Sequence, residues 1–259
     1  MAERAPRHVV MFSGGVTSWA AARRIADEHG TGALVLLFAD TRMEDEDTYR
    51  FLPEAAADIG APLVTVADGR DPWQVFRDER FLGNARVDPC SKILKRELLR
   101  RWVEAHLDPA DTVVVLGLDW TEGDRLTTNR ARWAPWPVRY PLAERPYRFK
   151  HQWLDRLRAA GVEPPRLYRL GFDHNNCGGA CVKAGQASWA LLLEAMPERY
   201  AAHERREQEL RDYLGKDVAI LRDRTGGRTR PLTLREFRER RQAGWQCDLF
   251  DRGGCGCVA

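Results

Sequence analysis

The sequence predicts an α/β fold, in which a parallel sheet is covered by helices on both faces. Four short apolar runs have the length and composition of buried strands: residues 8–12, 33–39, 63–66 and 112–117. Three intervening stretches have the residue types or the apolar spacing of helices: residues 19–29, 44–59 and 92–106. Strands that alternate with helices are typical of parallel sheets, because the helix carries the chain back to the edge where the next strand starts.

The composition is that of an ordinary globular protein. The chain has 259 residues, of which 44% are hydrophobic and 31% charged, so it can bury a sizeable core. Its net charge of +3 is too small to indicate a nucleic-acid partner by itself. No apolar run approaches the length of a membrane span, and the first residues lack the layout of a signal peptide. We therefore expect a cytoplasmic protein with no membrane partner; the sequence leaves its oligomeric state open.

The first strand runs into a glycine-bearing turn that leads into a helix, Ser13-Gly14-Gly15-Val16-Thr17-Ser18. Glycines let a backbone approach a ligand closely, and the N–H groups at the start of a helix form a site for anions. Ser13, Thr17 and Ser18 add hydroxyl groups to the turn. The pattern favours a phosphate-binding turn over an ordinary tight connection between strand and helix.

Polar or glycine residues follow three of the predicted strands. They are Ser13–Gly15, Asp40-Thr41 and Gly117–Asp119. Ligands of parallel sheets bind beyond the carboxyl ends of the strands. We therefore expect these three segments to meet at one crevice.

Beyond residue 118 the pattern changes. Residues 132–148 contain four prolines, which exclude a regular helix or a central strand. Helices are expected at 151–161, at 186–214 with an interruption at Pro197, and at 234–243, with a short strand at 218–222. We expect two parts: residues 1–185 with the nucleotide-binding sheet, and residues 186–259, a helical, basic region that ends in a cysteine-bearing tail.

The six cysteines favour thiol or metal chemistry over disulfides in a cytoplasmic protein. Cys177-Gly178-Gly179-Ala180-Cys181 places two thiols close together, with glycines that let both sulfurs face one ion. Three or four thiolates from Cys90, Cys177, Cys181 and a tail cysteine, Cys255, would suffice for an iron–sulfur cluster, or alternatively for zinc. The alternative is that these cysteines are small buried apolar residues, which we expect for Cys247.

The turn at residues 13–18 resembles the Ser-Gly-Gly-x-x-Ser loop of the PP-loop ATP pyrophosphatases, with Thr17 where that family usually has Asp. Later stretches look like the phosphoadenylylsulfate (PAPS) reductases of the same superfamily, in the same order. These are Asp40-Thr41, Asp88-Pro89-Cys90-Ser91-Lys92, Leu116-Gly117-Leu118-Asp119 with Arg125, Tyr140-Pro141-Leu142 and Cys177-x-x-x-Cys181. The resemblance covers residues 8 to about 185.

This resemblance implies a Rossmann-like fold that binds an adenine nucleotide, either ATP with Mg²⁺ or PAPS/APS. Its implied binding residues are Ser13, Gly14, Gly15, Thr17, Ser18, Asp40, Thr41 and Gly117. Members that use ATP cleave its α–β phosphate bond, adenylate an oxygen, and let a sulfur or nitrogen nucleophile displace AMP. Cations that stabilise the developing charge would come from Lys92, Lys95 or Arg125.

Our leading hypothesis is an ATP-dependent sulfur transfer, or a related adenylation-driven modification, of a nucleobase. Its partners would be a nucleobase or nucleic-acid acceptor and a sulfur donor protein. The first alternative is a PAPS/APS-type reductase whose catalytic thiol is Cys257 in the tail, although the tail lacks the histidine of the family motif. The second is a non-catalytic nucleotide-sensing subunit of a modification or defence complex, which Thr17 in place of Asp suggests.

Residues 199–241 are rich in arginine, and with Trp133, Trp136 and Trp245 they offer a surface that stacks bases and follows a polynucleotide backbone. Positive and negative side chains that alternate along the sequence, as in Glu204-Arg205-Arg206-Glu207, instead favour a solvated helix. We expect the solvated helix.

Overall fold

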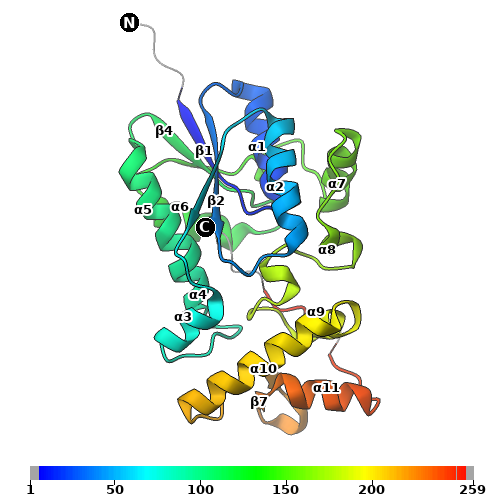
Figure 1. Ribbon diagram of the computed structural model, residues 1–259. Helices are drawn as coiled ribbons and strands as arrows, with labels where there is room; N and C mark the ends of the chain where they lie inside the picture. The colour runs from blue at the N-terminus through cyan, green and yellow to red at the C-terminus, as the bar shows by residue number, and fades with distance from the viewer. Residues whose placement is uncertain (1–5, 249, 255–259) are drawn as a thin grey trace, which may run out of the picture.

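The computed structural model describes residues 6–248 and 250–254. Five parallel strands form one sheet in the order β3-β2-β1-β4-β5 (Figure 1). They are β1 (Arg7–Met11), β2 (Leu34–Asp40), β3 (Leu63–Ala67), β4 (Thr112–Val115) and β5 (Val138–Arg139). The predicted α/β class with a parallel sheet is confirmed. The sequence missed β5, a two-residue edge strand that follows Pro137 inside the proline-rich stretch.

Alternate residues of each strand face opposite layers of helices. Val10, Leu36 and Phe38 pack in one core cluster with α1 (Val16–His29), α2 (Glu46–Ile59) and α7 (Lys150–Ala159). Val9 and Leu37 pack in another with α5 (Leu98–His106) and α6 (Gly123–Trp133). Helices therefore cover both faces of the sheet, as Figure 1 shows.

The helical segment that leads into α5 contains a wide turn. It consists of α4 (Pro89–Ser91), the π-helical stretch η1 (Lys92–Glu97) and α5 itself. A π-helix bonds each N–H to the carbonyl five residues earlier, so it takes in one residue more than an α-turn. The extra residue rotates the side chains on either side of it relative to a continuous α-helix.

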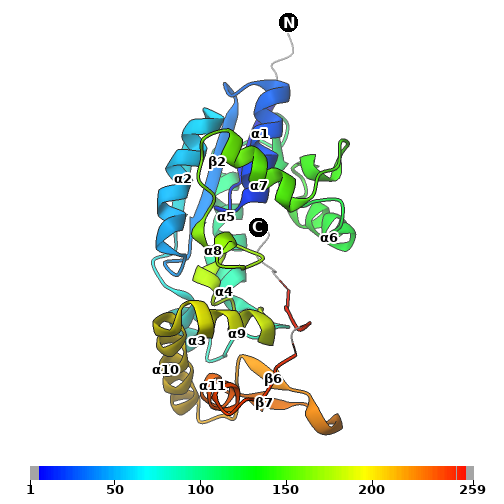
Figure 2. The ribbon, with the colours of Figure 1, turned by 90° about the vertical axis from the view of Figure 1, so that its right-hand side faces the viewer.

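The C-terminal part is mostly helical and lies beyond one end of the sheet in both views (Figure 2). Its elements are α9 (Gln186–Ala195), α10 (Pro197–Leu214), β6 (Leu221–Asp223), η4 (Thr225–Gly227), β7 (Arg230–Leu232) and α11 (Leu234–Gln242). Strands β6 and β7 form an antiparallel pair, of which the sequence predicted only the first.

The core of this part also takes in side chains from before residue 185. Trp73 and Phe76 of α3 (Pro72–Asp78) belong to the same cluster as Trp189, Tyr200 and Phe237. The remaining short elements are η2 (Pro141–Ala143), α8 (Arg166–Arg169) and η3 (Cys177–Gly179). The division of the chain at residue 185 stays a prediction.

Helix α10 carries a buried carboxyl group, Glu207, and a buried imidazole, His203. The Glu207 carboxylate accepts the backbone N–H groups of Ile220 at 2.9 Å and Leu234 at 2.6 Å. Burial raises the pKa of Glu207 to about 7 and lowers the pKa of His203 to about 4. His203 Nδ1 accepts a hydrogen bond from Trp73 Nε1 at 3.1 Å, which assigns the lone pair to that nitrogen.

Among the helices that the structure describes, none combines the length and the apolar character needed to cross a membrane.

The low pKa of His203 predicts an acid sensitivity of the fold. Between pH 6.5 and pH 4 the unfolded chain binds a proton at this histidine and the folded chain does not, so acidification favours unfolding. We expect His203→Gln to lower the free energy of unfolding at pH 7. Because the variant lacks the titrating imidazole, its free energy of unfolding should approach that of wild type by roughly 3 kcal/mol between pH 7 and pH 4. Urea unfolding at several pH values measures both free energies.

The matched control is His106→Gln, because His106 is an exposed histidine at the end of α5. A change of the same size with pH in His106→Gln would show that the effect does not come from the burial of His203. If the free energy of unfolding of His203→Gln differs from that of wild type by the same amount at pH 7 and at pH 4, the low pKa of His203 is contradicted.

Candidate functional site

The turn between β1 and α1 has the geometry that its two glycines permit. Gly14 has φ of +75°, and a Cβ there would lie 2.8 Å from Thr48 Cγ2. Gly15 is the N-cap of α1. The Ser18 hydroxyl donates to the Gly15 carbonyl at 2.8 Å, and Ser13 Oγ donates to Ser18 Oγ at 3.4 Å. The hydroxyls are thus held beside the first turn of the helix.

Gly117, which follows β4, packs directly on this first turn. A Cβ at Gly117 would lie 2.8 Å from the Thr17 carbonyl oxygen and 2.9 Å from Ser18 N. Glycine is therefore needed for the end of β4 to reach the start of α1. Two of the segments that the sequence expected at one crevice are in contact.

Two residues from the later part of the chain support the turn. Tyr168 OH accepts the Val16 N–H at 3.1 Å. Asn175, which is 2% exposed, donates through Nδ2 to the Gly14 carbonyl at 2.8 Å and to Thr48 Oγ1 at 3.0 Å. The cysteine-bearing segment is thereby attached to the turn.

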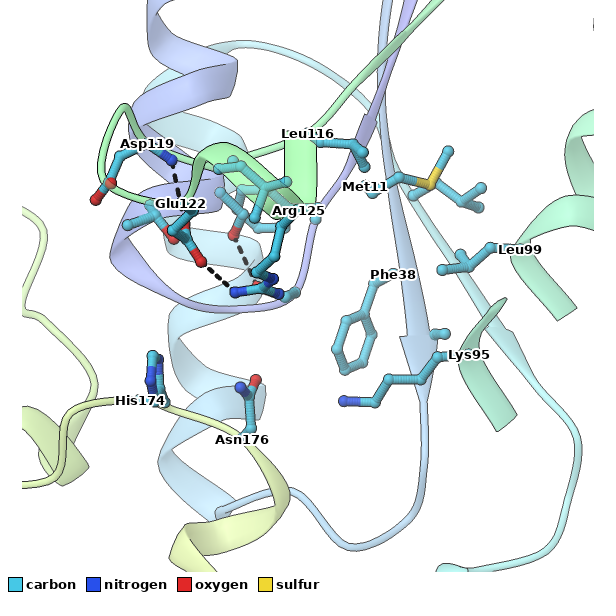
Figure 3. Close-up of a pocket in the computed structure, with 18 of the residues that line it drawn as sticks. Met11, Phe38, Lys95, Leu99, Leu116, Asp119, Glu122, Arg125, His174 and Asn176 are labelled. Atoms are coloured by element: carbon cyan, nitrogen blue, oxygen red, sulfur yellow. Dashed lines mark hydrogen bonds and ion pairs between the residues drawn. The ribbon is translucent and has the colours of Figure 1, made fainter. Parts of the chain in front are cut away.

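A cavity of about 280 Å³ opens at the carboxyl edge of β1, β2 and β4 (Figure 3). Four of the predicted binding residues line it: Ser13, Thr17, Ser18 and Gly117. Gly14 and Gly15 shape the turn and are not part of the lining. Apolar side chains from the sheet and α5 form another part of the wall: Met11, Leu37, Phe38, Leu99 and Leu116.

Charged side chains enter this cavity from several elements. Arg125 of α6 and Lys95 of η1 point toward the same space in Figure 3. Arg125 forms an ion pair with Glu122, yet its Nη2 is buried and has no hydrogen-bond partner among the described residues. Asp119 and Lys150 also line the cavity. The site therefore combines an apolar wall with cations and two carboxylates.

Lys92 lies elsewhere. Its side chain is 63% exposed and lies 3.5 Å from Glu97. Lys95, on the same π-helical stretch, is buried and lines the cavity. Of the three candidate cations, Lys95 and Arg125 are at the cavity and Lys92 is at the surface.

Asp40 and Thr41, at the end of β2, do not line the larger cavity. The Asp40 carboxylate accepts the Arg42 N–H at 2.8 Å and the Tyr49 hydroxyl at 2.8 Å. Thr41 is 2% exposed and donates to Glu44 Oε1 at 3.0 Å. Both residues organise the loop that follows β2.

Glu44 is the central residue of this loop, and sequence reasoning missed it. Its carboxylate is almost fully buried and also accepts from Lys95 Nζ at 3.2 Å and from the Cys177 N–H at 2.6 Å. The sequence placed Glu44 only at the start of a helix. No local signal identifies Lys95 and Cys177 as partners of Glu44, since they lie 51 and 133 residues away along the chain.

Three of the predicted thiols surround a second, smaller cavity. Cys90, Cys177 and Cys181 line it, and Lys95 lines both this cavity and the larger one. Cys177 has φ of +51°, a strained value for a residue other than glycine. Gly178 continues the left-handed turn with φ of +57°, and a Cβ there would collide with Arg199.

The predicted metal centre is incomplete in the described residues. They contain no group of three or more His, Cys, Asp or Glu side chains that could hold a metal ion. Cys90, Cys177 and Cys181 therefore do not form such a group by themselves. Cys255, the predicted further ligand, and Cys257, the predicted reductase thiol, lie outside the described residues.

No protein-family model matches this chain, and no curated protein matches its sequence. Its structure is similar to the crystal structure of a phosphoadenylyl-sulfate (PAPS) reductase from Candida auris in complex with phosphate. The TM-score is 0.47 and the identity 17%, over 66% of this chain and 80% of that chain. A match with this TM-score and identity supports no statement about function, which has to be inferred from the cavity and the sequence motifs.

The contact at Gly117 predicts a stability difference between two glycines near the same cavity. Gly117→Ala should lower the free energy of unfolding by about 1–3 kcal/mol, because its methyl group would push β4 away from α1. Gly123→Ala is the control, since a Cβ there meets nothing within 4 Å. Alanine in helix α6 should leave stability unchanged or raise it slightly. If the two variants unfold at the same urea concentration, the close approach of Gly117 to the first turn of α1 is contradicted.

Proposed function

We propose that this protein is a PP-loop-type enzyme that binds an adenine nucleotide in the larger cavity and uses ATP to adenylate an acceptor. The observation that carries the proposal is the lining of this cavity. Hydroxyls of the Ser13–Ser18 turn lie on one part of it, and an apolar wall with Phe38 lies on another. Phosphates and a purine ring need these two environments side by side.

The start of α1 suits the phosphate groups. Apart from the Val16 N–H, which Tyr168 OH accepts, the N–H groups of its first turn lie at the positive end of a helix dipole, and the Thr17 hydroxyl lines the cavity beside them. The Ser18 hydroxyl donates to the Gly15 carbonyl, whereas the Ser13 hydroxyl, 3.4 Å from Ser18 Oγ, can turn toward a phosphate. The buried Nη2 of Arg125 has no hydrogen-bond partner in the described part of the chain and offers one more donor. A phosphate oxygen would satisfy it, which supports the use of the cavity for an anion.

The proposed first step forms one bond and breaks one. An oxygen of the acceptor attacks the α-phosphorus of ATP, the bond between this phosphorus and the bridging oxygen breaks, and pyrophosphate leaves with the electron pair. Lys95 and Arg125 stabilise the negative charge that develops on the phosphates. Asp119 and Glu122 line the same cavity and, with the phosphates, would hold Mg²⁺, which neutralises phosphate charge.

The second step would transfer sulfur. A sulfur nucleophile attacks the carbon that carries the adenylated oxygen, a carbon–sulfur bond forms, and AMP leaves as the carbon–oxygen bond breaks. Thiols of Cys90, Cys177 and Cys181 lie around the adjoining cavity, which shares Lys95 with the nucleotide cavity. This proximity also favours the second candidate, a PAPS/APS-type reductase, because its substrates place sulfur on the same nucleotide.

Nucleotide binding tests the proposed cavity. Gly15→Val should reduce ATP affinity at least 100-fold, because a side chain there would fill space 3.1 Å from Tyr168 OH and disturb the turn. Ser13→Ala should reduce it about 10-fold or more, the cost of one hydrogen bond to a charged group. Isothermal titration calorimetry gives the affinities, and circular dichroism checks that the variants fold.

Thr128→Ala is the control, because Thr128 is an exposed threonine on α6 outside the cavity lining. Unchanged ATP affinity in Gly15→Val would place the nucleotide elsewhere. Pyrophosphate release from ATP would exclude a non-catalytic sensor. Tighter binding of PAPS or APS than of ATP, with sulfite released in the presence of a thiol, would favour the reductase.

We further propose that Cys90, Cys177 and Cys181 hold a metal centre with Cys255. Purification without oxygen followed by iron, sulfide and zinc analysis tests it. Iron and sulfide should be present in wild type and lost in Cys177→Ser and Cys181→Ser. Cys247→Ser is the control, since burial raises the pKa of this thiol in the C-terminal core. Zinc in place of iron would make the centre structural, and absence of both would contradict it.

A further inference from the structure

An exposed cluster of aromatic side chains lies at the rim of the larger cavity. Trp120, Tyr147 and Phe149 are 40%, 50% and 56% exposed. The Trp120 ring centroid lies 5.6 Å from that of Tyr147 and 5.7 Å from that of Phe149. Phe149 in turn stacks on His151 at 5.9 Å, with 10° between the ring planes. We call Trp120, Tyr147 and Phe149 the aromatic rim.

These rings are unusual for the surface of this chain. The described residues expose eight large hydrophobic side chains, and three of them are the aromatic rim. The tryptophans that the sequence offered for base stacking, Trp133 and Trp136, are only 4% and 7% exposed and belong to the core beside the sheet. Their burial excludes the base-stacking alternative for these two residues, and the exposed rings lie before and after them in the sequence.

Both segments that carry the aromatic rim, the one around Trp120 and the one that contains Tyr147 and Phe149, also contribute residues to the cavity lining. Trp120 stands between Asp119 and Thr121, which both line the cavity. Phe149 directly precedes Lys150, which lines it as well. In Figure 2 the loop before α7 and the start of α6 lie near one another. A planar group stacked on these rings would therefore be next to the entrance of the cavity.

Positive charge accompanies the rings. Between Glu144 and Asp155 the chain has three lysine or arginine residues and no acidic residue. The Arg145 guanidinium lies 5.7 Å from the centroid of the Tyr147 ring. Lys150 Nζ donates to the Asp173 carbonyl at 2.5 Å, which holds it at the cavity wall. Rings interleaved with cations are the surface that single-stranded nucleic acids bind, through stacked bases and neutralised phosphates.

We propose that the aromatic rim binds single-stranded nucleic acid by stacking its bases, and so delivers one nucleotide to the cavity as the acceptor. As a choice of acceptor this inference rests on the proposed function, whereas the binding itself depends only on the rim. A flat protein partner would also accept exposed rings, but Arg145, Arg148 and Lys150, which lie beside Tyr147 and Phe149 in the sequence, favour a polyanion.

Binding of labelled oligonucleotides tests the inference. Fluorescence anisotropy would compare single-stranded DNA and RNA of about 12 nucleotides with an abasic oligomer of equal length. Wild type should bind the base-bearing strands more tightly than the abasic one, since stacking needs bases. Trp120→Ala and Phe149→Ala should each weaken this binding roughly 5- to 150-fold and leave ATP affinity unchanged. The DNA and RNA arms show which strand is the acceptor.

Tyr213→Ala is the matched control, because Tyr213 is 39% exposed and carries Arg77 at 4.5 Å, but lies on α10 in the C-terminal part. It should bind oligonucleotides like wild type. Equal affinity for abasic and base-bearing strands, or unchanged binding in both rim variants, would overturn the proposal. Self-association that Phe149→Ala abolishes, without oligonucleotide binding, would instead assign the rim to a second copy of the chain. Oligonucleotide binding without ATP binding would support nucleic-acid binding at the aromatic rim and contradict the proposed function.

Discussion

The buried carboxylate of Glu44 is the constraint on which both cavities depend. A buried charge is costly unless it is paired and hydrogen-bonded. Glu44 meets this requirement with Thr41 at the end of β2, Lys95 on the π-helical stretch, and the N–H of Cys177. These groups come from three separate segments, so the carboxylate fixes the position of each relative to the sheet. Lys95, which Glu44 holds, is the residue that both cavities share.

The acidic residues Asp45 and Asp47 extend the same arrangement to the C-terminal segments. Asp45, 1% exposed, is paired with Arg166 at 2.7 Å and with Arg199 at 3.4 Å. Asp47 accepts the backbone N–H of Arg166 at 2.7 Å. The loop after β2 therefore connects the sheet to α8 and α10 through charge-assisted bonds, which are directional in a way that apolar packing is not. This explains how thiols from distant segments come to lie beside a sheet edge.

The sequence predicted the features that are encoded locally. Apolar runs located β1 to β4, and the glycine-bearing turn was found because strand, turn and helix are contiguous. Glu44 could not be found, since its burial depends on partners far along the chain. Lys92 and Lys95 were both candidate cations, because neither helical spacing nor the residue types show which of the two lysines is buried. Trp120 is exposed and Trp133 is buried because of how each packs in the folded chain, which the composition of the sequence does not show.

The larger cavity has a different chemistry on each of its two sides, and this asymmetry suits a two-step reaction. Through Lys95 it adjoins the thiols of Cys90, Cys177 and Cys181, and through Asp119 and Thr121 it adjoins the aromatic rim. In the proposed reaction the nucleotide lies between a sulfur side and an acceptor side. In that reaction the acceptor would enter over the rim, whereas sulfur would come from the thiols that line the second cavity. Since displacement of AMP needs the adenylated acceptor, separate approaches for acceptor and sulfur suit a reaction in which adenylation comes first.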